Sequence, residues 1–169
     1  MAENFLEQLV AEWYEYQGYF VRRNMHVGRR PKGGYECELD VVAFHPATKH
    51  LVHVEPSTDA TSWEKREHRY QKKFGAGRKY IPDMFAAVLP PGEVLEIEQV
   101  ALLVFAPKNT ERRLAGGRVL HVSQFLLQIT RHFSEAGSMM KGQVPEQFGI
   151  LRTLQFVVEY RRDLFGTLH

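Results

Sequence analysis

The stretch ELDVVAFHPATKHLVHVEPS, residues 38–57, decides how the fold of this chain is interpreted. Its two apolar segments, 38–44 and 50–56, have the length and the content of Val, Leu and Phe that are typical of strands. The HPATK segment between them is a turn-like connection short enough for a hairpin. The sequence therefore predicts a pair of antiparallel strands at the centre of a sheet.

Acidic side chains gather on one face of this predicted hairpin. Because strand side chains alternate between faces, Asp40 shares a face with Glu38, and Glu55 shares one with His53 and Ser57. If the two strands pair, Asp40 and Glu55 can lie across from one another, where two carboxylates repel each other unless a cation lies between them. Carboxylate oxygens suit Mg²⁺ or Mn²⁺, so this pair predicts a metal site.

Pro56 fits the same interpretation, since proline lacks the amide proton but keeps a carbonyl that can be a further metal ligand. The alternative is that Asp40 and Glu55 line a solvated sheet face or pair with nearby arginines. His53 is interpreted first as a core or hydrogen-bonded histidine and second as a neighbour of the metal.

Periodic patterns predict further elements on both sides of the hairpin. Thr61 and Glu64 have the spacing of a capping box at the start of a basic helix, and Gly and Pro predict a loop over 26–36. The other predicted elements are helices at 3–16, 61–74, 121–137 and 145–164, and strands at 19–24, 84–91 and 99–107. This order predicts an α/β fold in which a central mixed sheet is flanked by helices.

The bulk composition is that of an ordinary globular domain. The chain has 169 residues, 44% hydrophobic and 25% charged, which predicts one domain over 1–169 with a core at 3–107 and C-terminal helices at 121–164. No apolar stretch approaches the roughly 20 residues that cross a bilayer, and the acidic N-terminal segment is unlike a signal peptide. The single cysteine, Cys37, excludes an internal disulfide. We therefore expect a cytoplasmic protein without membrane contact.

Basic residues are clustered although the net charge is only +2. Residues 22–32 hold five Arg and Lys with His26 and no acid, and residues 65–79 hold seven with His68 against one acid, Glu67. Such clusters are typical of a phosphate-binding surface, and the alternative is two solvated faces. The residues predicted to contact nucleic acid are Arg29, Arg30, Lys32, Arg66 and Arg69.

Three segments in this order, LEQLVAEWYEYQGYFVRRN, ECELDVVAF and HLVHVEPS, followed by a basic helix, resemble the PD-(D/E)XK or restriction-endonuclease-like superfamily of nucleases. The resemblance covers residues 3 to about 80. It implies a restriction-endonuclease-like core in which Glu7 is the helix carboxylate, Asp40 the first metal ligand and Glu55 the second. It also implies Mg²⁺- or Mn²⁺-dependent hydrolysis of phosphodiester bonds by an endonuclease that acts on nucleic acid, most simply DNA, and it leaves a homodimer open.

Ser57 departs from the superfamily pattern, in which this strand position is a lysine that offsets charge at the scissile phosphate. Serine can hydrogen-bond water but carries no positive charge. Some members of the superfamily supply this lysine from the following helix. At 3.6 residues per turn, Arg66, Arg69 and Lys73 form a stripe of the predicted helix that can reach the edge of the sheet. Lys73 is therefore the first choice, with Lys72 and Lys65 behind it. Two alternatives to a nuclease remain: a catalytically inactive domain of the same fold that binds nucleic acid, and an interaction domain whose basic helix meets an acidic protein.

Overall fold

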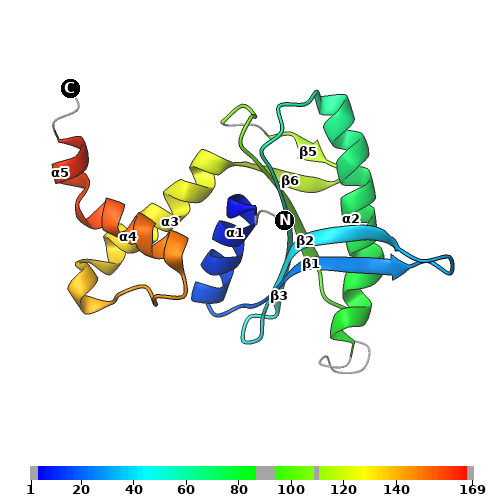
Figure 1. Ribbon diagram of the computed structural model, residues 1–169, viewed down its shortest axis with the longest axis horizontal. Coiled ribbons are helices and arrows are strands. Elements are labelled where there is room, and N and C mark those ends of the chain that lie inside the picture. The colour runs from blue at the N-terminus through cyan, green and yellow to red at the C-terminus, as the bar shows by residue number, and fades with distance from the viewer. Residues whose placement is uncertain (1–3, 87–93, 109–110, 167–169) are drawn as a thin grey trace.

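The structure is a computed structural model that describes residues 4–86, 94–108 and 111–166. It contains a six-stranded mixed sheet of order β1-β2-β3-β4-β6-β5, flanked by helices (Figure 1). The strands are β1 (Phe20–Arg29), β2 (Tyr35–His45), β3 (His50–Ser57), β4 (Ile97–Leu103), β5 (Arg113–Leu114) and β6 (Gly117–His121). The helices are α1 (Phe5–Tyr16), α2 (Trp63–Phe85), α3 (Val122–Ala136), the 3-10 helix η1 (Met139–Lys141), α4 (Gly149–Glu159) and α5 (Arg161–Phe165). The predicted α/β fold with a central mixed sheet is confirmed.

The two long strands β1 and β2 form a hairpin, and β2 forms a second one with β3. Strand β3 then runs parallel to β4, and β4 runs parallel to β6. The parallel connection from β3 to β4 passes through α2, which is the crossover arrangement that parallel strands require. No helix among the described residues combines the length and the apolar content that crossing a membrane requires.

The helices α1 and α2 cover opposite faces of the sheet (Figure 1). On the α1 face, Leu6 and Leu9 of the helix pack with Val52 and Val54 of β3 in one apolar core that also includes α3 and α4. Two further apolar clusters lie under α2, one of them around Ile81. Burial of apolar side chains on both faces explains why the central strands read as nearly continuous hydrophobic runs.

The C-terminal helices are fixed to α1 by a buried carboxylate. Glu12 is 5% exposed, and its Oε2 accepts hydrogen bonds from the backbone N–H groups of Ile150 and Leu151, both at 2.9 Å. These N–H groups belong to the first turn of α4, and the N–H groups of a first turn have no hydrogen-bond acceptor within their own helix. Glu12 therefore caps α4 and orients it against α1.

The pleat of β2 changes phase in the middle of the strand. Cys37 and Leu39 pack in the same apolar cluster as Val42 and Phe44, although an odd and an even position should face opposite sides. The regular alternation therefore breaks between residues 39 and 42, which is where Asp40 lies.

This break separates the Glu38 and Asp40 side chains. Asn24 of β1 lies at the same level and has a positive φ of 53°, a conformation for which Asn is one of the better-suited residues. The Glu38 carboxylate pairs with His26 at 3.6 Å, whereas Asp40 turns to α2. The prediction that Glu38 and Asp40 share a face is therefore wrong, because it assumed an unbroken pleat.

Several predicted boundaries are also wrong. The loop predicted over 26–36 belongs largely to β1 and β2, and the basic helix predicted at 61–74 continues to Phe85. Residues 84 and 85 of the strand predicted at 84–91 are therefore helical, and 87–91 lie outside the described residues. The N-cap of α2 is Ser62, whose Oγ accepts from Lys65 N at 3.4 Å, and not Thr61. The strands β5 and β6 had no counterpart in the prediction.

Two glycines of α2 differ in their surroundings, and this difference is testable. A Cβ added at Gly77 would lie 2.4 Å from Nδ1 of His53, whereas a Cβ at Gly75 would meet nothing within 4 Å. We expect Gly77→Ala to lower the free energy of unfolding by about 1–3 kcal/mol through overpacking. Gly75→Ala is the matched control and should raise it by about 0.5–1 kcal/mol. Urea denaturation measures both, and equal effects would contradict the close contact.

Candidate functional site

Two carboxylates from neighbouring strands meet beside α2. The β2–β3 register pairs Val41 with Val54, and the next pair in line is Asp40 and Glu55. The backbone N–H of Asp40 donates to Oε1 of Glu55 at 3.1 Å. Glu55 is 2% exposed and the Asp40 side chain 16%. The structure thus brings these two predicted site residues together.

Lys73 of α2 lies between the two carboxylates. Its Nζ is 2.5 Å from Oδ1 of Asp40 and 2.8 Å from Oε2 of Glu55, and it also donates to the backbone carbonyl of Glu38 at 2.6 Å. Of the three lysines considered from the sequence, this is the one that reaches the carboxylates. Lys72 and Lys65 are exposed on α2.

The charged side chains of this group shift one another's pKa values. Burial first, and then the negative charge of Glu55, raise the pKa of Asp40 from 3.8 to about 7, although Lys73 opposes the shift. Burial works against the Lys73 ammonium, but the charges of Glu55 and Asp40 outweigh it and raise the pKa of Lys73. One ammonium therefore does not fully compensate the carboxylates, and the site favours additional positive charge.

Glu7, the predicted helix carboxylate, lies in the first turn of α1, near the same group. Its Oε1 accepts from Nδ2 of Asn4, the N-cap residue, at 2.7 Å. Burial and then the charge of Asp40 raise the pKa of Glu7, while Lys73 lowers it. Glu7 is therefore close enough to be influenced by the charges of both residues, although it contacts neither of them directly among the described contacts.

A chain of hydrogen bonds, buried except at Arg78, orients Glu55. Arg78 donates to Oε1 of Gln99 at 2.6 Å, and Nε2 of Gln99 donates to the carbonyl of Phe74 and to Nδ1 of His53 at 3.2 Å. Since Nδ1 of His53 accepts, Nε2 carries the proton and donates to Oε1 of Glu55 at 2.7 Å. Burial, and next the charge of Lys73, lower the pKa of His53 to about 3, so the ring is neutral.

This chain shows why the interpretation of His53 from sequence is confirmed in its first form. The histidine is fully buried and hydrogen-bonded, and its Nε2 is already engaged by Glu55. Gln99 and Arg78 were not anticipated, because they are 46 and 25 positions away in sequence and only the β3–β4 pairing and α2 bring them near. The sole local signal is the small residue Gly77, which makes room for the His53 ring.

The end of β3 carries a second cation. Ser57 is buried, and its Oγ accepts from NH2 of Arg69 at 2.7 Å. NH1 of Arg69 pairs with Asp59, whose backbone N–H donates to the Ser57 Oγ at 3.2 Å. The guanidinium also lies over the ring of Tyr70, and the Tyr70 hydroxyl donates to the carbonyl of Glu55 at 2.9 Å. Positive charge is thus present beside Ser57 although serine has none.

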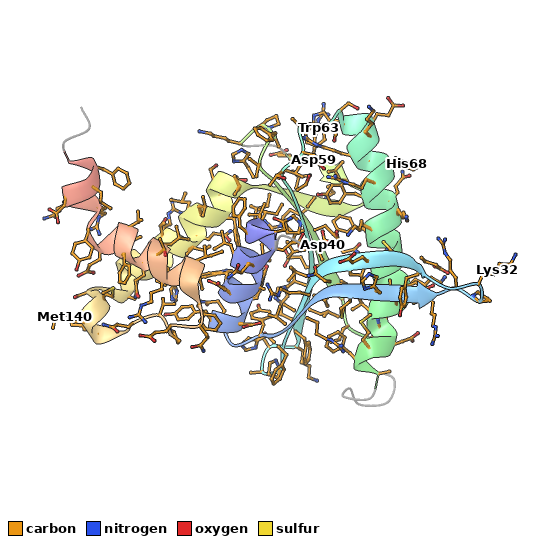
Figure 2. All side chains as sticks on the ribbon, in the orientation of Figure 1. Lys32, Asp40, Asp59, Trp63, His68 and Met140 are labelled. Carbon is orange, nitrogen blue, oxygen red and sulfur yellow. The ribbon has the colours of Figure 1, made fainter. Side chains whose placement is uncertain are left out.

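The other predicted site residues are placed differently. Arg66 is 4% exposed, and its NH2 binds the backbone carbonyls of Asp59 and Phe105, so its position argues against contact with nucleic acid. Pro56 is buried in β3 next to Glu55. The three remaining residues are exposed at the free end of the β1–β2 hairpin, which projects past α2, with Lys32 at its tip (Figures 1 and 2). They are Arg29, Arg30 and Lys32.

The donor set suits a hard cation and is small. Among the described residues, no group of three or more His, Cys, Asp and Glu side chains is arranged to hold a metal ion. Two carboxylates with a shortage of compensating charge nevertheless fit Mg²⁺ or Mn²⁺, which keep several waters and use one or two carboxylates. The residues that would hold the ion are Asp40 and Glu55, with the Pro56 carbonyl as the predicted third ligand.

Comparison with known proteins does not name a family. The chain matches no family model, and no curated protein gives a significant match. It is similar to a solved structure titled "Crystal Structure of Protein of Unknown Function AF1548", with 14% sequence identity and a TM-score of 0.42, over 96% of this chain and 98% of that one. A likeness at this level assigns neither a fold family nor a function to this chain. A functional conclusion therefore has to come from the geometry of the site.

Proposed function

We propose that this protein is a nuclease of the PD-(D/E)XK superfamily that hydrolyses phosphodiester bonds of DNA with Mg²⁺ or Mn²⁺. The observation that carries the proposal is the Lys73 ammonium between the carboxylates of Asp40 and Glu55, at 2.5 and 2.8 Å. A lysine beside two strand carboxylates is the arrangement that the sequence resemblance implied, with the lysine supplied by the helix.

A divalent cation held by Asp40 and Glu55 would stabilise negative charge on the phosphate and make water more acidic. Oε1 of Glu55 is engaged by His53 and by the backbone of Asp40, so Oε2 is the oxygen that Lys73 and a cation would share. Lys73 contacts both carboxylates, so its ammonium would lie beside a cation held there and could hydrogen-bond a phosphate oxygen or the attacking water.

Arg69 can supply the charge that Ser57 lacks. Its guanidinium is fixed by Ser57, Asp59 and the Tyr70 ring at the end of β3, next to Glu55. A planar guanidinium offers two parallel donors to a phosphate, and its charge does not depend on pH in the physiological range. Lys73 and Arg69 together would therefore stabilise the charge that develops on phosphorus, which is where preorganised donors contribute most.

A test of this function is divalent-cation-dependent cleavage of DNA. We expect the native protein to cleave supercoiled or linear duplex DNA in Mg²⁺ or Mn²⁺ and to stop when EDTA is added, because the carboxylates alone cannot activate water. Gel electrophoresis of end-labelled DNA measures both. Absence of cleavage with every divalent cation and with duplex, branched and single-stranded DNA would contradict the proposal.

The second candidate is a domain that binds nucleic acid without cleaving it. The observation that favours it is that Lys73 already neutralises part of the carboxylate charge, so the group can be a self-contained buried ion cluster. Such a domain would bind DNA but would gain no stability from Mg²⁺. The exposed arginines of the β1–β2 hairpin serve either candidate.

A further inference from the structure

A cleft lies between the β1–β2 hairpin and α2, next to Asp40, Glu55 and Lys73. We call these three residues the carboxylate group. The volume of the cleft is about 380 Å³, and its lining residues are Arg30, Glu36, Cys37, Lys72, Gly75, Ala76 and Lys79. We call it the hairpin cleft. This volume is in the lower part of the range of small-ligand pockets, so the cleft admits a phosphate with its sugar but not a duplex.

The hairpin cleft and the carboxylate group are contiguous. The backbone carbonyl of Glu38 accepts both the Sγ–H of Cys37, which lines the cleft, at 3.5 Å and the Nζ of Lys73 at 2.6 Å. Lys72, the neighbour of Lys73 on α2, lines the cleft as well. Cys37 and Asp40 are three positions apart along the strand, which is roughly 10 Å.

The walls of the cleft are held in place by polar contacts. The Glu36 carboxylate of β2 pairs with Lys79 at 3.1 Å and accepts from the Tyr80 hydroxyl at 2.7 Å, which ties the hairpin to α2. Gly28 makes this possible, because a Cβ there would lie 2.6 Å from the Tyr80 oxygen and 2.7 Å from Glu36. Arg30 is fixed in the hairpin turn, where its N–H donates to the Gly34 carbonyl at 3.0 Å.

The cleft has an excess of positive charge and an accessible floor. Arg30, Lys72 and Lys79 face one carboxylate, Glu36. Among the described residues, neither Arg30 nor Lys72 has a carboxylate within ion-pair distance, whereas Lys79 is paired with Glu36. A Cβ added at Gly75 would meet nothing within 4 Å, so an anion can approach the helix surface closely.

We propose that the hairpin cleft binds one backbone phosphate of the nucleic-acid strand whose neighbouring phosphodiester bond enters the carboxylate group. The inference rests on the proposed function in that the strand passes from one site to the other. A separation of roughly 10 Å corresponds to about one to two nucleotides of a strand, because successive phosphates are displaced around the helix as well as along its axis. Arg30 and Lys72 supply the unpaired charges, and the β1–β2 hairpin continues the contact beyond the cleft.

The experiment fills the cleft without removing charge. Gly75→Gln places a neutral side chain into the open space over the floor. The matched control is Gly149→Gln at the start of α4, where a Cβ also meets nothing within 4 Å. Fluorescence anisotropy with a labelled duplex oligonucleotide in EDTA gives the dissociation constant without any cleavage. We expect Gly75→Gln to raise Kd by about five- to tenfold and Gly149→Gln to leave it unchanged.

A charge variant tests the same site by another measurement. Lys72→Ala should lower the slope of log affinity against log salt by about 1 between 50 and 200 mM salt, because one phosphate contact fewer releases fewer counterions. Lys65→Ala, also exposed on α2, should leave the slope unchanged. A single-stranded oligonucleotide in place of the duplex shows whether one strand is sufficient for the contact.

The outcomes separate this inference from the proposed function. Unchanged affinity in Gly75→Gln together with an unchanged slope in Lys72→Ala would overturn the cleft subsite, even if the protein cleaves DNA. Weakened binding in both variants without cleavage by any divalent cation would support the subsite and contradict the nuclease. If the native protein binds no oligonucleotide at low salt, the subsite is overturned, whatever the cleavage assay shows.

Discussion

Lys73→Ala is expected to lower the rate of DNA cleavage by about two to three orders of magnitude. The ammonium of Lys73 lies between Asp40 and Glu55, at 2.5 and 2.8 Å, and no other lysine of α2 reaches them. Its charge is needed most as negative charge develops on the phosphate, so its loss falls on the transition state. We expect kcat to fall while the affinity for DNA in EDTA stays nearly constant.

Two further variants make this expectation specific. Lys65→Ala removes an exposed lysine from the same helix and should cleave like the native protein. Lys73→Arg keeps the charge but changes its shape, and partial activity would identify the charge as the essential property. Because Lys73→Ala leaves two buried carboxylates without their cation, it is also expected to destabilise the fold by about 3–5 kcal/mol. Cleavage is therefore measured below the unfolding temperature of each variant, determined by circular dichroism.

If Lys73→Ala cleaves at the native rate, the charge has to come from elsewhere. Arg69 is then the next residue to change, since its guanidinium lies at the end of β3 against Ser57. Arg69→Lys keeps a charge but loses the fork that holds Ser57 and Asp59 together. Normal cleavage in both single variants and in the double variant would contradict the roles proposed for the Lys73 and Arg69 charges.

Short-range sequence patterns predicted the central hairpin and the choice of Lys73. Alternation along the two strands placed Asp40 opposite Glu55, and the helical period put Lys73 on the stripe of α2 that faces the sheet edge. Both predictions use the regular period of one strand or one helix, which relates the directions of side chains a few positions apart. The same geometry failed at Glu38, because the break in the pleat beside Asn24 is a local conformation that no period describes.

Longer-range features of the site were beyond such patterns. Gln99 fixes the tautomer of His53 from another strand, and this contact exists only because β3 and β4 run in parallel at one register. The continuation of α2 past Gly75 and Gly77 was missed since glycine and proline usually end a helix. Here Gly77 is tolerated because the packing of α2 on His53 requires its small size. Tertiary packing thus outweighed local propensity at the residues nearest the site.

The contribution of Asp40 to the stability of the metal-free protein is expected to fall as the pH rises from about 4 to about 7, whereas His53, whose pKa is lowered to about 3, contributes in the opposite direction over much of this range. Burial and the charge of Glu55 raise the pKa of Asp40 from 3.8 to about 7. Between these values the native carboxyl keeps a proton that the unfolded chain has released, so the contribution of Asp40 to the free energy of unfolding decreases with rising pH. About three pKa units make this contribution on the order of 4 kcal/mol.

Asp40→Asn should remove this contribution, because an amide does not ionise. Urea denaturation in EDTA at several pH values measures it as a difference between the two proteins. We expect the free energy of unfolding of Asp40→Asn to increase relative to the native protein as the pH rises through this window. Asp83→Asn, at an exposed position of α2, is the control and should follow the native curve. Parallel curves for Asp40→Asn and the native protein would contradict an abnormally high pKa at Asp40.

Mg²⁺ is expected to restore the lost stability, and to do so most strongly where Asp40 is ionised. A cation that binds only the folded protein competes with the proton for the carboxylates, so its effect grows as the pH rises. For a dissociation constant on the order of 1 mM, 10 mM Mg²⁺ adds about 1.4 kcal/mol and raises Tm by a few degrees. The shift should be larger above about pH 7 than near pH 5, and it should disappear in Asp40→Asn and in Glu55→Gln but persist in Asp83→Asn. Equal shifts in all four proteins would mean that the cation binds elsewhere, and the carboxylate pair would then be a buried ion cluster with Lys73 as its permanent partner.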